Sequence, residues 1–418
     1  MIQLIRGFKD ILPGEVELWQ QIEKTARSLF EDFGFKEIRI PILERTELFA
    51  RSIGQDTDIV EKEMYTFPDR KGELITLRPE ATASVCRSYI QHKLYAKDPV
   101  QKYYTIGPMF RRERPQKGRY RQFYQINAEI IGVDSPLVDV ELIFLLVTLF
   151  AKLAVEGIEI HINSLGCPEC RPSFKVMLTD FLTSSTENLC SDCVRRKDRN
   201  PLRVLDCKVP ACREAMTDAP SMVNYLCAAC GQHFETTKTT LDVLKIPFTV
   251  NKHLVRGLDY YTRTTFEIQT ESLGAQSAVA GGGRYDGLIK ALGGPDTPAT
   301  GFAIGIDRLA EISGLNITDF IQTPDIFFAA LGQKSRSFAF EWKCALCLEG
   351  IKAEMDFGEK SLKSQMKRAN RLGAKHVLIV GDNEIKQGAV ILRNMTTKKQ
   401  VSIPIQDIAE NIKAKLRS

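Results

Sequence analysis

The chain has 418 residues, of which 44% are hydrophobic and 26% are charged, and its formal net charge is +5. This length allows two or three domains with substantial cores, and the composition is that of an ordinary globular protein. No run approaches the ~18 uncharged apolar residues that a membrane-spanning helix requires. The N-terminal stretch MIQLIRGFKD also lacks the charged-then-apolar order of a signal peptide. We therefore expect a cytoplasmic protein.

The positive charge is concentrated in the C-terminal segment. Residues 325–418 contain 17 Lys and Arg against 10 Asp and Glu, whereas the whole chain has a net charge of +5. The remainder of the chain is therefore slightly acidic. A basic segment favours a polyanionic partner, although basic surfaces are common on globular proteins.

The first predicted elements are a helix and a strand. From Glu15 to Phe33 apolar residues recur close to helical spacing, and Gly34 ends the pattern. Residues 37–43, EIRIPIL, alternate as a strand that contains Pro41. Because proline cannot donate a ladder hydrogen bond, we expect this strand at a sheet edge or an interface.

The stretch from Thr76 to Ser84, TLRPEATAS, has two interpretations. Pro79 followed by Glu80 is ordinarily the start of a helix, because an acidic residue in the first turn complements the helix dipole. A carboxylate beside a hydroxyl, as in Glu80 and Thr82, is also what binding an ammonium group requires.

A long, basic hairpin is predicted next. Residues 101–106 and 122–130 carry apolar or aromatic side chains at about every second position, and Pro115–Gly118 supplies the turn. Arginine binds phosphate in bidentate fashion, so the hairpin indicates either contact with a nucleic-acid backbone or a solvated basic surface. The basic side chains are Arg111, Arg112, Arg114, Lys117, Arg119 and Arg121, and the aromatic ones are Tyr120, Phe123 and Tyr124.

Contact with nucleic acid is favoured over a solvated basic surface, because residues 110–113, FRRE, resemble motif 2 of class II aminoacyl-tRNA synthetases. The longer stretch FRRERPQKGRYRQF is similar to the histidyl-tRNA synthetase family. The resemblance implies an α+β catalytic core built on an antiparallel sheet. It also implies a homodimer, because the early helix and the strand containing Pro41 correspond in order to motif 1, which builds the dimer interface of this class.

Three later stretches carry the same resemblance. Residues 256–261, RGLDYY, and residues 280–288, AGGGRYDGL, are similar to the two histidine-type motifs of the family. Residues 299–309, ATGFAIGIDRL, match motif 3 in loose form. The glycine run is not a Walker loop, because no Gly-Lys-Ser/Thr follows it. Its glycines are expected to let a substrate approach the backbone closely.

The resemblance implies a two-step ligase reaction. Histidine and ATP give histidyl-adenylate and pyrophosphate, with Mg²⁺, and histidine then passes to the 3′ end of tRNA(His). Attack of a carboxylate on a phosphate brings two anions together, and a fixed guanidinium lowers that cost. No side chain is expected to act as a covalent nucleophile, so catalysis consists of positioning and charge neutralisation.

The resemblance also assigns the site residues. Gln125 and Glu129 lie four apart on one strand and therefore face the same side; Gln125 is assigned to the amino group and Glu129 to an imidazole N–H, a contact that gives strong discrimination. The catalytic residues are Arg111, Glu113, Arg256 and Arg308; the histidine-binding residues are Glu80, Ala81, Thr82, Arg111, Gln125, Glu129, Arg256, Tyr260, Tyr261 and Tyr285; the ATP-binding residues are Arg111, Glu113, Arg121, Gly305 and Arg308; and Gln116 approaches the tRNA acceptor end.

A cysteine-rich insertion is predicted at about residues 165–240, where eight of the eleven cysteines lie. The first two C-x2-C pairs have zinc spacing, and the other two pairs make a second set. Which pairs combine is left open by the sequence. Disulfides are not expected in the cytosol, so one or two structural zinc sites are favoured. The cysteines are Cys167, Cys170, Cys190, Cys193, Cys207, Cys212, Cys227 and Cys230; His233 is a further candidate ligand, and Cys86, Cys344 and Cys347 are expected in the core.

In the last part of the chain, the sequence pattern predicts a linker at residues 312–324 and a small α/β domain at 325–418. Strands are expected at 327–332, 376–381, 388–394 and 400–405, and helices at 344–353, 362–372 and the C-terminus. The resemblance implies a catalytic domain at 1–324 and an anticodon-binding domain at 325–418.

Two alternatives to the ligase fit the sequence less well. The first is a non-catalytic, histidine-synthetase-like regulatory subunit of ATP phosphoribosyltransferase, but such proteins lack the C-terminal domain and lose motif residues. The second, a general nucleic-acid-binding protein, leaves RGLDYY and Glu80 unexplained. The sequence therefore predicts a histidine–tRNA ligase.

Overall fold

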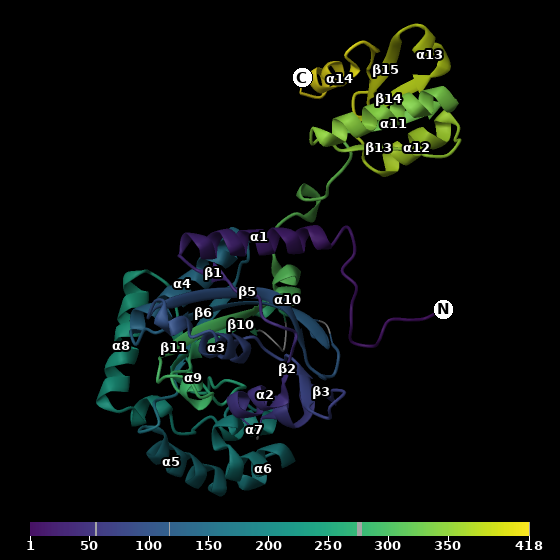
Figure 1. The fold of residues 1–418 in the computed structure, drawn as a ribbon. Helices are drawn as coiled ribbons and strands as arrows, with labels where there is room; N and C mark the ends of the chain where they lie inside the picture. The colour runs from purple at the N-terminus through teal and green to yellow at the C-terminus, as the bar shows by residue number, and fades with distance from the viewer. Residues whose placement is uncertain (55–56, 117, 274–277, 418) are drawn as a thin grey trace. The chain divides into compact units, whose positions relative to one another are not determined.

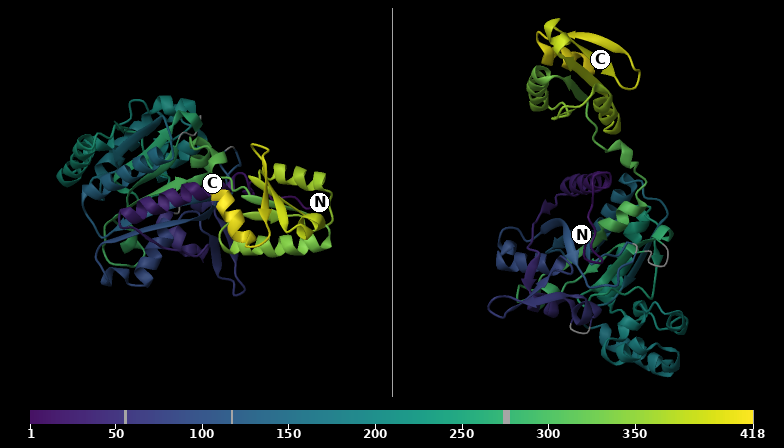
Figure 2. Two further views of the ribbon diagram at one scale, coloured as in Figure 1. Left: turned by 90° about the horizontal axis from the view of Figure 1, so that it is seen from above. Right: turned by 90° about the vertical axis from the view of Figure 1, so that its right-hand side faces the viewer.

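The computed structural model describes residues 1–54, 57–116, 118–273 and 278–417, so Lys117, predicted within the hairpin turn, lies outside the described residues. The chain divides into two compact units, Met1–Ile317 and Thr318–Ser418 (Figures 1 and 2). Within the described ranges, no helix is both long enough and apolar enough to cross a membrane.

The first unit is built on an eight-stranded sheet in the order β1-β5-β6-β11-β10-β9-β7-β8. The outer pairs β1–β5 and β7–β8 are parallel, and all the pairs between them are antiparallel. The expected antiparallel core is therefore confirmed. The strands are β1 (Lys36–Glu37), β5 (Gln101–Phe110), β6 (Gln122–Ile131), β7 (Ile158–Ser164), β8 (Thr249–Val250), β9 (Thr262–Thr270), β10 (Ala278–Arg284) and β11 (Ala299–Gly305).

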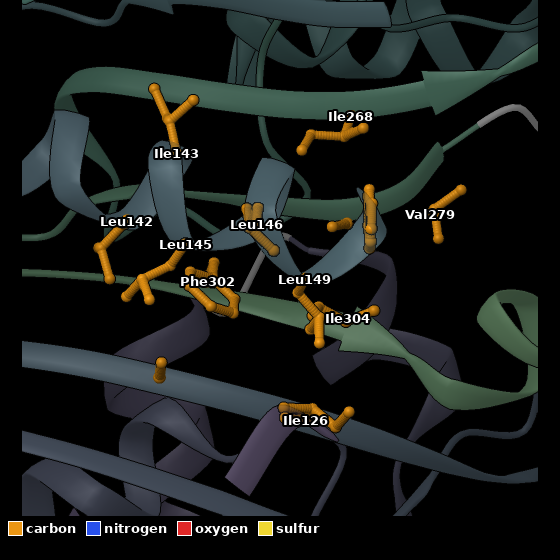
Figure 3. Close-up of a cluster of buried hydrophobic side chains, with 14 of the residues drawn as sticks. Ile126, Leu142, Ile143, Leu145, Leu146, Leu149, Ile268, Val279, Phe302 and Ile304 are labelled. Atoms are coloured by element: carbon orange, nitrogen blue, oxygen red, sulfur yellow. The ribbon is translucent and has the colours of Figure 1, made fainter. Parts of the chain in front are cut away.

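One face of this sheet is covered by α4 (Pro136–Lys152), the apolar helix that follows the hairpin (Figure 3). The helix begins at Pro136, because Ser135 caps it and proline fits its first turn. Its buried leucines and Ile143 pack on alternate residues of the strands below, including Ile126 and Phe302. The helices α1 (Val16–Asp32), α8 (Ala228–Val243) and α10 (Ile306–Ile312) complete this layer.

The opposite face of the sheet carries the polar residues of β6. Ile126 and Ala128 belong to the core beneath α4, so Gln125, Asn127 and Glu129 point to the other side. The buried cluster on this side includes residues of α3 (Thr82–Gln91), α9 (Leu288–Ala291) and the insertion helices α5 (Arg171–Ser184), α6 (Ser191–Arg199) and α7 (Pro210–Ala215). Helix α2 (Thr46–Ile53) packs against α3.

The strand predicted at residues 37–43 is interrupted. Strand β1 ends at Glu37, and a separate three-stranded sheet begins with β2 (Leu43–Arg45), followed by β3 (Tyr65–Pro68) and β4 (Leu74–Leu77). Between them, the buried Arg78 donates to the carbonyls of Ile40 at 2.9 Å and Pro41 at 3.3 Å. A side chain from elsewhere in the chain thus satisfies backbone groups that a ladder would otherwise pair.

The second unit is an α/β domain with a five-stranded sheet in the order β13-β12-β14-β15-β16. The helix predicted at 344–353 is wrong in extent: α11 begins at Gln333, and Cys347 is exposed rather than in the core. The buried side of its first half consists of the small residues Ser335 and Ala339, which give little apolar signal. The elements are β12 (Ile326–Leu331), α11 (Gln333–Leu348), β13 (Ala353–Met355), α12 (Leu362–Arg371), β14 (His376–Gly381), α13 (Asp382–Lys386), β15 (Ala389–Asn394), β16 (Gln400–Pro404) and α14 (Ile408–Arg417).

Candidate active site

A pocket opens on the face of the large sheet opposite α4. It is bounded by β6, β10 and β11, by the end of the hairpin, and by the segment that precedes β9. Most of the predicted site residues line it, although they come from six separate segments of the chain. Those that line it are Glu80, Thr82, Arg111, Glu113, Gln125, Arg256, Tyr260, Tyr261, Tyr285, Gly305 and Arg308.

The carboxylate of Glu129 lies buried behind Thr82 and Tyr285, two residues of the pocket lining. It accepts a hydrogen bond from the Thr82 hydroxyl at 2.7 Å and another from the Tyr285 phenol. Burial raises the pKa of Glu129 from its ordinary value of 4.5 to about 8, although the two hydrogen bonds oppose that change. The group therefore holds a proton at neutral pH unless a bound donor or cation stabilises the carboxylate.

Glu80 lies at the start of α3, as one interpretation predicted, and its role in binding an ammonium group stays a prediction. Its carboxylate accepts hydrogen bonds from the main-chain N–H groups of Thr82 at 2.7 Å and Ala83 at 2.9 Å, at the start of α3. The same side chain lines the pocket. Burial raises its pKa, and these backbone hydrogen bonds oppose the increase. Ala81, the next residue, is fully buried.

Two amide side chains of β6 present unused hydrogen-bonding atoms in the pocket. Within the described part of the chain, Oε1 of Gln125 and Nδ2 of Asn127 are buried without a hydrogen-bond partner. Because buried polar atoms are nearly always paired, both atoms are suited to a ligand. Asn127 was not predicted. It lies midway between Gln125 and Glu129, so the same strand alternation would have identified it.

Arg256 lies flat against the glycine-rich strand β10. A Cβ atom on Gly281 would come within 2.2 Å of its guanidinium, so this glycine makes room for a protein side chain rather than for a substrate alone. The guanidinium forms an ion pair with Glu267 and lies over the ring of Tyr261. Burial lowers the pKa of Arg256, but Glu267, Tyr261 and Asp206 together more than offset this, and its pKa is raised overall. Glu267 is a second pocket residue that was not predicted.

The other charged residues of the predicted site lie on the hairpin or make contact with it. Arg111 donates to the carbonyl of Pro79 at 2.9 Å and lies over the ring of Phe123. Glu113 forms an ion pair with Arg119 at 2.9 Å. Arg308 donates to the carbonyl of Gly118 at 3.2 Å, which ties the motif 3 helix to the hairpin tip.

Four residues predicted for histidine, ATP or tRNA lie outside the pocket lining: Ala81 and Glu129 are buried, and Arg121 and Gln116 belong to the hairpin. Arg121 donates to the carbonyls of Glu113 at 3.4 Å and Arg6 at 3.2 Å, and thereby connects the hairpin to the N-terminal segment. Gln116 pairs with Arg119 across the turn. The roles given to Arg121 and Gln116, in ATP binding and at the tRNA acceptor end, stay predictions.

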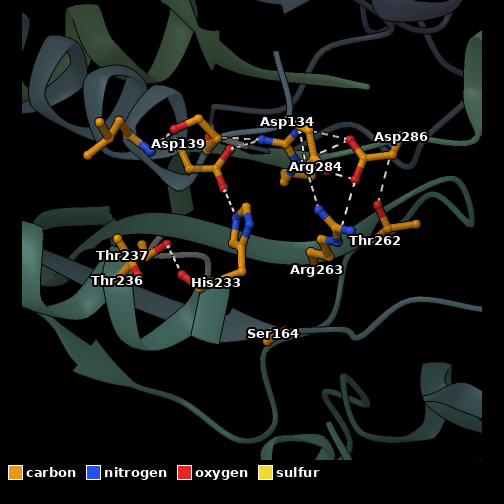
Figure 4. Close-up of polar contacts among 12 residues, drawn as sticks. Asp134, Asp139, Ser164, His233, Thr236, Thr237, Thr262, Arg263, Arg284 and Asp286 are labelled. Atoms are coloured by element: carbon orange, nitrogen blue, oxygen red, sulfur yellow. Dashed lines mark hydrogen bonds and ion pairs between the residues drawn. The ribbon is translucent and has the colours of Figure 1, made fainter. Parts of the chain in front are cut away.

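A buried charge network lies at the end of β10, next to Tyr285 (Figure 4). Arg284 is fully buried and donates to Asp139 of α4 at 3.1 Å; it also pairs with Asp286 at 3.0 Å. Asp139 in turn contacts Nε2 of His233 at 2.8 Å. His233 is thus engaged with a carboxylate of α4 and belongs to neither cysteine group, contrary to its suggested role as a metal ligand.

The eight cysteines of the insertion form two groups, each with its sulfur atoms within 4.8 Å of one another. The groups are nested along the chain: the first and last pairs meet, and so do the two middle pairs. Each group brings its ligand atoms close enough together that they could hold one metal ion. One consists of Cys167, Cys170, Cys227 and Cys230, and the other of Cys190, Cys193, Cys207 and Cys212.

Comparison with known proteins covers both units. Residues 7–309 match the model of histidyl-tRNA synthetase, and residues 325–415 match that of an anticodon binding domain. The chain is 61% identical to the histidine–tRNA ligase of Desulfatibacillum aliphaticivorans, over 99% of each chain. It is 55% identical to that of Geobacter sulfurreducens, over 99% of this chain and 100% of the relative.

A solved structure gives the same result. The crystal structure of apo histidyl-tRNA synthetase from S. aureus matches with a TM-score of 0.82 and 36% identity, over 98% of this chain and 99% of that chain. The resemblance read from the motifs is thereby confirmed, and the chain belongs to the histidyl-tRNA synthetase family.

Proposed function

We propose that this chain is a histidine–tRNA ligase and that the pocket on the large sheet performs both of its steps. The observation that carries the proposal is that the buried Glu129 is bonded to Tyr285, a wall of the same pocket that the guanidinium groups of Arg111 and Arg256 line. The Glu129–Tyr285 pair offers a carboxylate to a nitrogen heterocycle, and the arginines offer fixed positive charge to a phosphate. The relatives named histidine–tRNA ligase support the same activity.

Histidine binds at the inner end of the pocket in this proposal. Glu129 accepts a hydrogen bond from the imidazole, and Tyr285 and Thr82 hold the carboxylate in position. Glu80 and Gln125 receive the α-ammonium group, and Tyr260 and Tyr261 form the walls. An amino acid without a ring N–H supplies no donor to Glu129, so it lacks the contact that distinguishes histidine in this pocket.

In the first step the histidine carboxylate attacks the α-phosphorus of ATP. A new carboxyl–phosphorus bond forms, and the bond to pyrophosphate breaks. Arg111 and Arg256 are already held by the Pro79 carbonyl and by Glu267, so they neutralise the developing charge without reorganising. Glu113, Arg308 and Gly305 bind the nucleotide, with Arg121 supporting the hairpin.

In the second step the terminal 3′-hydroxyl of tRNA(His) attacks the histidyl carbonyl, and AMP leaves. Gln116, at the hairpin turn, approaches the acceptor end. Mg²⁺ would neutralise phosphate charge when bound with ATP. The pocket carboxylates of Glu113 and Glu267 are oxygen ligands of the kind that this ion prefers.

The two domains and the homodimer also belong to the proposed function. Residues 1–324 form the catalytic domain, and residues 325–418 bind the anticodon. The chain acts in the cytoplasm as a homodimer; apolar side chains exposed on and beside the three-stranded sheet support a second copy as the partner. Sedimentation equilibrium of the purified chain tests this. The exposed residues are Ile42, Leu43, Phe67 and Leu74.

The regulatory-subunit alternative is not favoured. Relatives that cover nearly the whole chain are named histidine–tRNA ligases. The four residues assigned to catalysis also line one pocket.

The residue roles are tested by ATP–pyrophosphate exchange with Arg256→Met. This variant keeps the volume of the side chain but removes its charge, so we expect exchange to fall at least ~100-fold. Arg87→Met is the matched control, because Arg87 pairs with Glu44 outside the pocket. Circular dichroism and the melting temperature, compared with the wild-type protein, check that the variant is folded. Exchange at the wild-type rate in Arg256→Met would contradict the assignment.

A further inference from the structure

The two cysteine groups of the insertion have the geometry of closed metal sites. Sulfur–sulfur distances are 3.6 Å between Cys167 and Cys170 and 3.9 Å between Cys167 and Cys227. In the second group Cys190 and Cys207 are 3.9 Å apart. Four thiolates bound at about 2.3 Å to one tetrahedral zinc lie about 3.8 Å from each other, which agrees with these values.

Disulfides, iron–sulfur clusters and plain core packing agree less well with this clustering. A disulfide would bring two sulfur atoms to about 2.05 Å, whereas all eight cysteines are free thiols at longer distances. A four-iron cluster gives each thiolate its own iron and so spreads the four sulfur atoms apart. Core packing alone does not explain why eight thiols gather in two groups of four, because a buried thiol can pack equally well against other apolar side chains.

Backbone N–H groups support both tetrads. The N–H of Cys227 donates to the sulfur of Cys170 at 3.1 Å, and the N–H of Cys190 donates to the sulfur of Cys212 at 3.1 Å. Such donors stabilise a thiolate and fix its direction, as outer partners of metal ligands do. The same arrangement recurs in two places that share no sequence segment.

We propose that the insertion binds two structural zinc ions. The base site consists of Cys167, Cys170, Cys227 and Cys230, and the outer site consists of Cys190, Cys193, Cys207 and Cys212. All-thiolate tetrahedral ligation with no open position is typical of structural zinc. This inference does not depend on the ligase reaction.

The base site joins the two ends of the insertion. It connects the turn after β7 to the start of α8, and Gly166 takes the positive φ of +61° that this turn needs. The next residue after Cys170 is Arg171, which donates to the main-chain carbonyl of Tyr261 in the pocket and to that of Leu165. The base site therefore positions the backbone of a pocket wall.

The outer site holds together the short helices between these ends. Its residues surround α6 and α7, and Cys193 and Cys212 are fully buried. From the same module Arg203 donates to the carbonyl of Arg256 at 3.0 Å, and Asn200 donates to Asp259 at 2.9 Å. The outer site thus braces the segment that carries Arg256.

The primary test is the metal content of the full-length wild-type protein. It is expressed in zinc-supplied medium, dialysed against EDTA to remove loosely bound ions, and analysed by mass spectrometry of its metals. We expect two zinc ions per chain. Expression with Co²⁺ instead should give the visible bands of tetrahedral, thiolate-bound cobalt, with twice the intensity of a single site.

Paired variants separate the two sites. Cys167→Ser/Cys170→Ser should retain one zinc, with faster amide exchange near residues 166–170 and 227–233. Cys190→Ser/Cys193→Ser should also retain one zinc, with faster exchange confined to residues 186–216. The matched control is Cys344→Ser/Cys347→Ser, because this pair has the same C-x2-C spacing but belongs to neither tetrad; it should retain two.

The wild-type measurement keeps the proposal falsifiable even if a variant fails to fold. Zinc-free protein whose eight thiols are recovered free or as disulfides would overturn it. Stoichiometric iron in place of zinc would overturn the choice of metal. Loss of zinc from the control pair would overturn the assignment of ligands.

Discussion

Gly301 lies so close to Glu129 that a Cβ atom on it would come within 1.6 Å of the carboxylate oxygen Oε2. The two residues are direct partners in the β11–β6 ladder. The absence of a side chain on one strand therefore makes room for the buried acid on the other. A glycine of motif 3 thus helps to build the proposed histidine pocket.

Gly301→Ala should displace the Glu129 carboxylate. We expect kcat/KM for histidine in ATP–pyrophosphate exchange to fall by about 100-fold, because a misplacement of about 1 Å can cost that much. Gly287→Ala is the control, since its Cβ would meet no described atom within 4 Å; it should retain activity. Wild-type exchange in Gly301→Ala would contradict the role given to Glu129.

The raised pKa of Glu129 should make the ligand-free protein less stable as pH rises. Its folded-state pKa is about 8, against an ordinary 4.5, so between these values the folded protein holds a proton that the unfolded chain has released. The stabilisation is complete below pH 4.5 and is lost as pH rises towards 8. From pH 6 to 8 the loss is roughly 2 kcal/mol.

Glu129→Gln isolates this contribution, because the amide does not titrate. Urea unfolding of both proteins at pH 6 and pH 8, without ligand, should show a smaller loss of stability in the variant. Saturating histidine should reduce the difference, because a bound imidazole stabilises the carboxylate. The same pH dependence in both proteins would mean that Glu129 titrates near its ordinary pKa.

Asn127→Ala should reduce activity without destabilising the fold. The Nδ2 atom is buried without a partner among the described residues, so removing it should leave the melting temperature unchanged or raise it. If this atom binds a substrate, kcat/KM should fall about tenfold, the effect of one lost hydrogen bond. Thr300→Val is the control: its hydroxyl is also buried and unpaired among those residues, but outside the pocket lining. Equal activity in both variants would remove Asn127 from the site.

Asp139→Asn should destabilise the first unit by about 3 kcal/mol. The change leaves the fully buried Arg284 with one carboxylate fewer, and breaking a buried pair is costly. Asp296→Asn is the control, because its pair with Lys290 is exposed at both ends, and such pairs contribute less than about 1 kcal/mol. Denaturant unfolding compares the two, and equal effects would show that the network is not a major contributor.

The sequence was most informative where one local pattern decides the outcome. Strand alternation in residues 101–106 and 122–130 predicted the hairpin, and most of the substrate-binding residues that the motifs assigned do line the pocket. The pattern was less informative where distant segments meet. Arg78 interrupts the predicted strand by donating to Ile40 and Pro41, and Arg256 packs on Gly281. Neither contact leaves a periodic pattern in the sequence from which it could be predicted.

The cysteines show the same limit. Their spacing indicated metal ligands but left the partnership of the pairs open, whereas the fold joins the outermost pairs and the innermost pairs. The partnership is decided by where β7 ends and α8 begins. These positions depend on the packing of α8 against α4, so the spacing alone could not provide the pairing.

The central claim is that Glu129 and Tyr285 select histidine for activation in this pocket. ATP–pyrophosphate exchange with each of the twenty amino acids, without tRNA, tests it most directly. We predict exchange with histidine alone in the wild-type protein. Absence of exchange from folded protein that still binds histidine, or equal exchange with another amino acid, would contradict it.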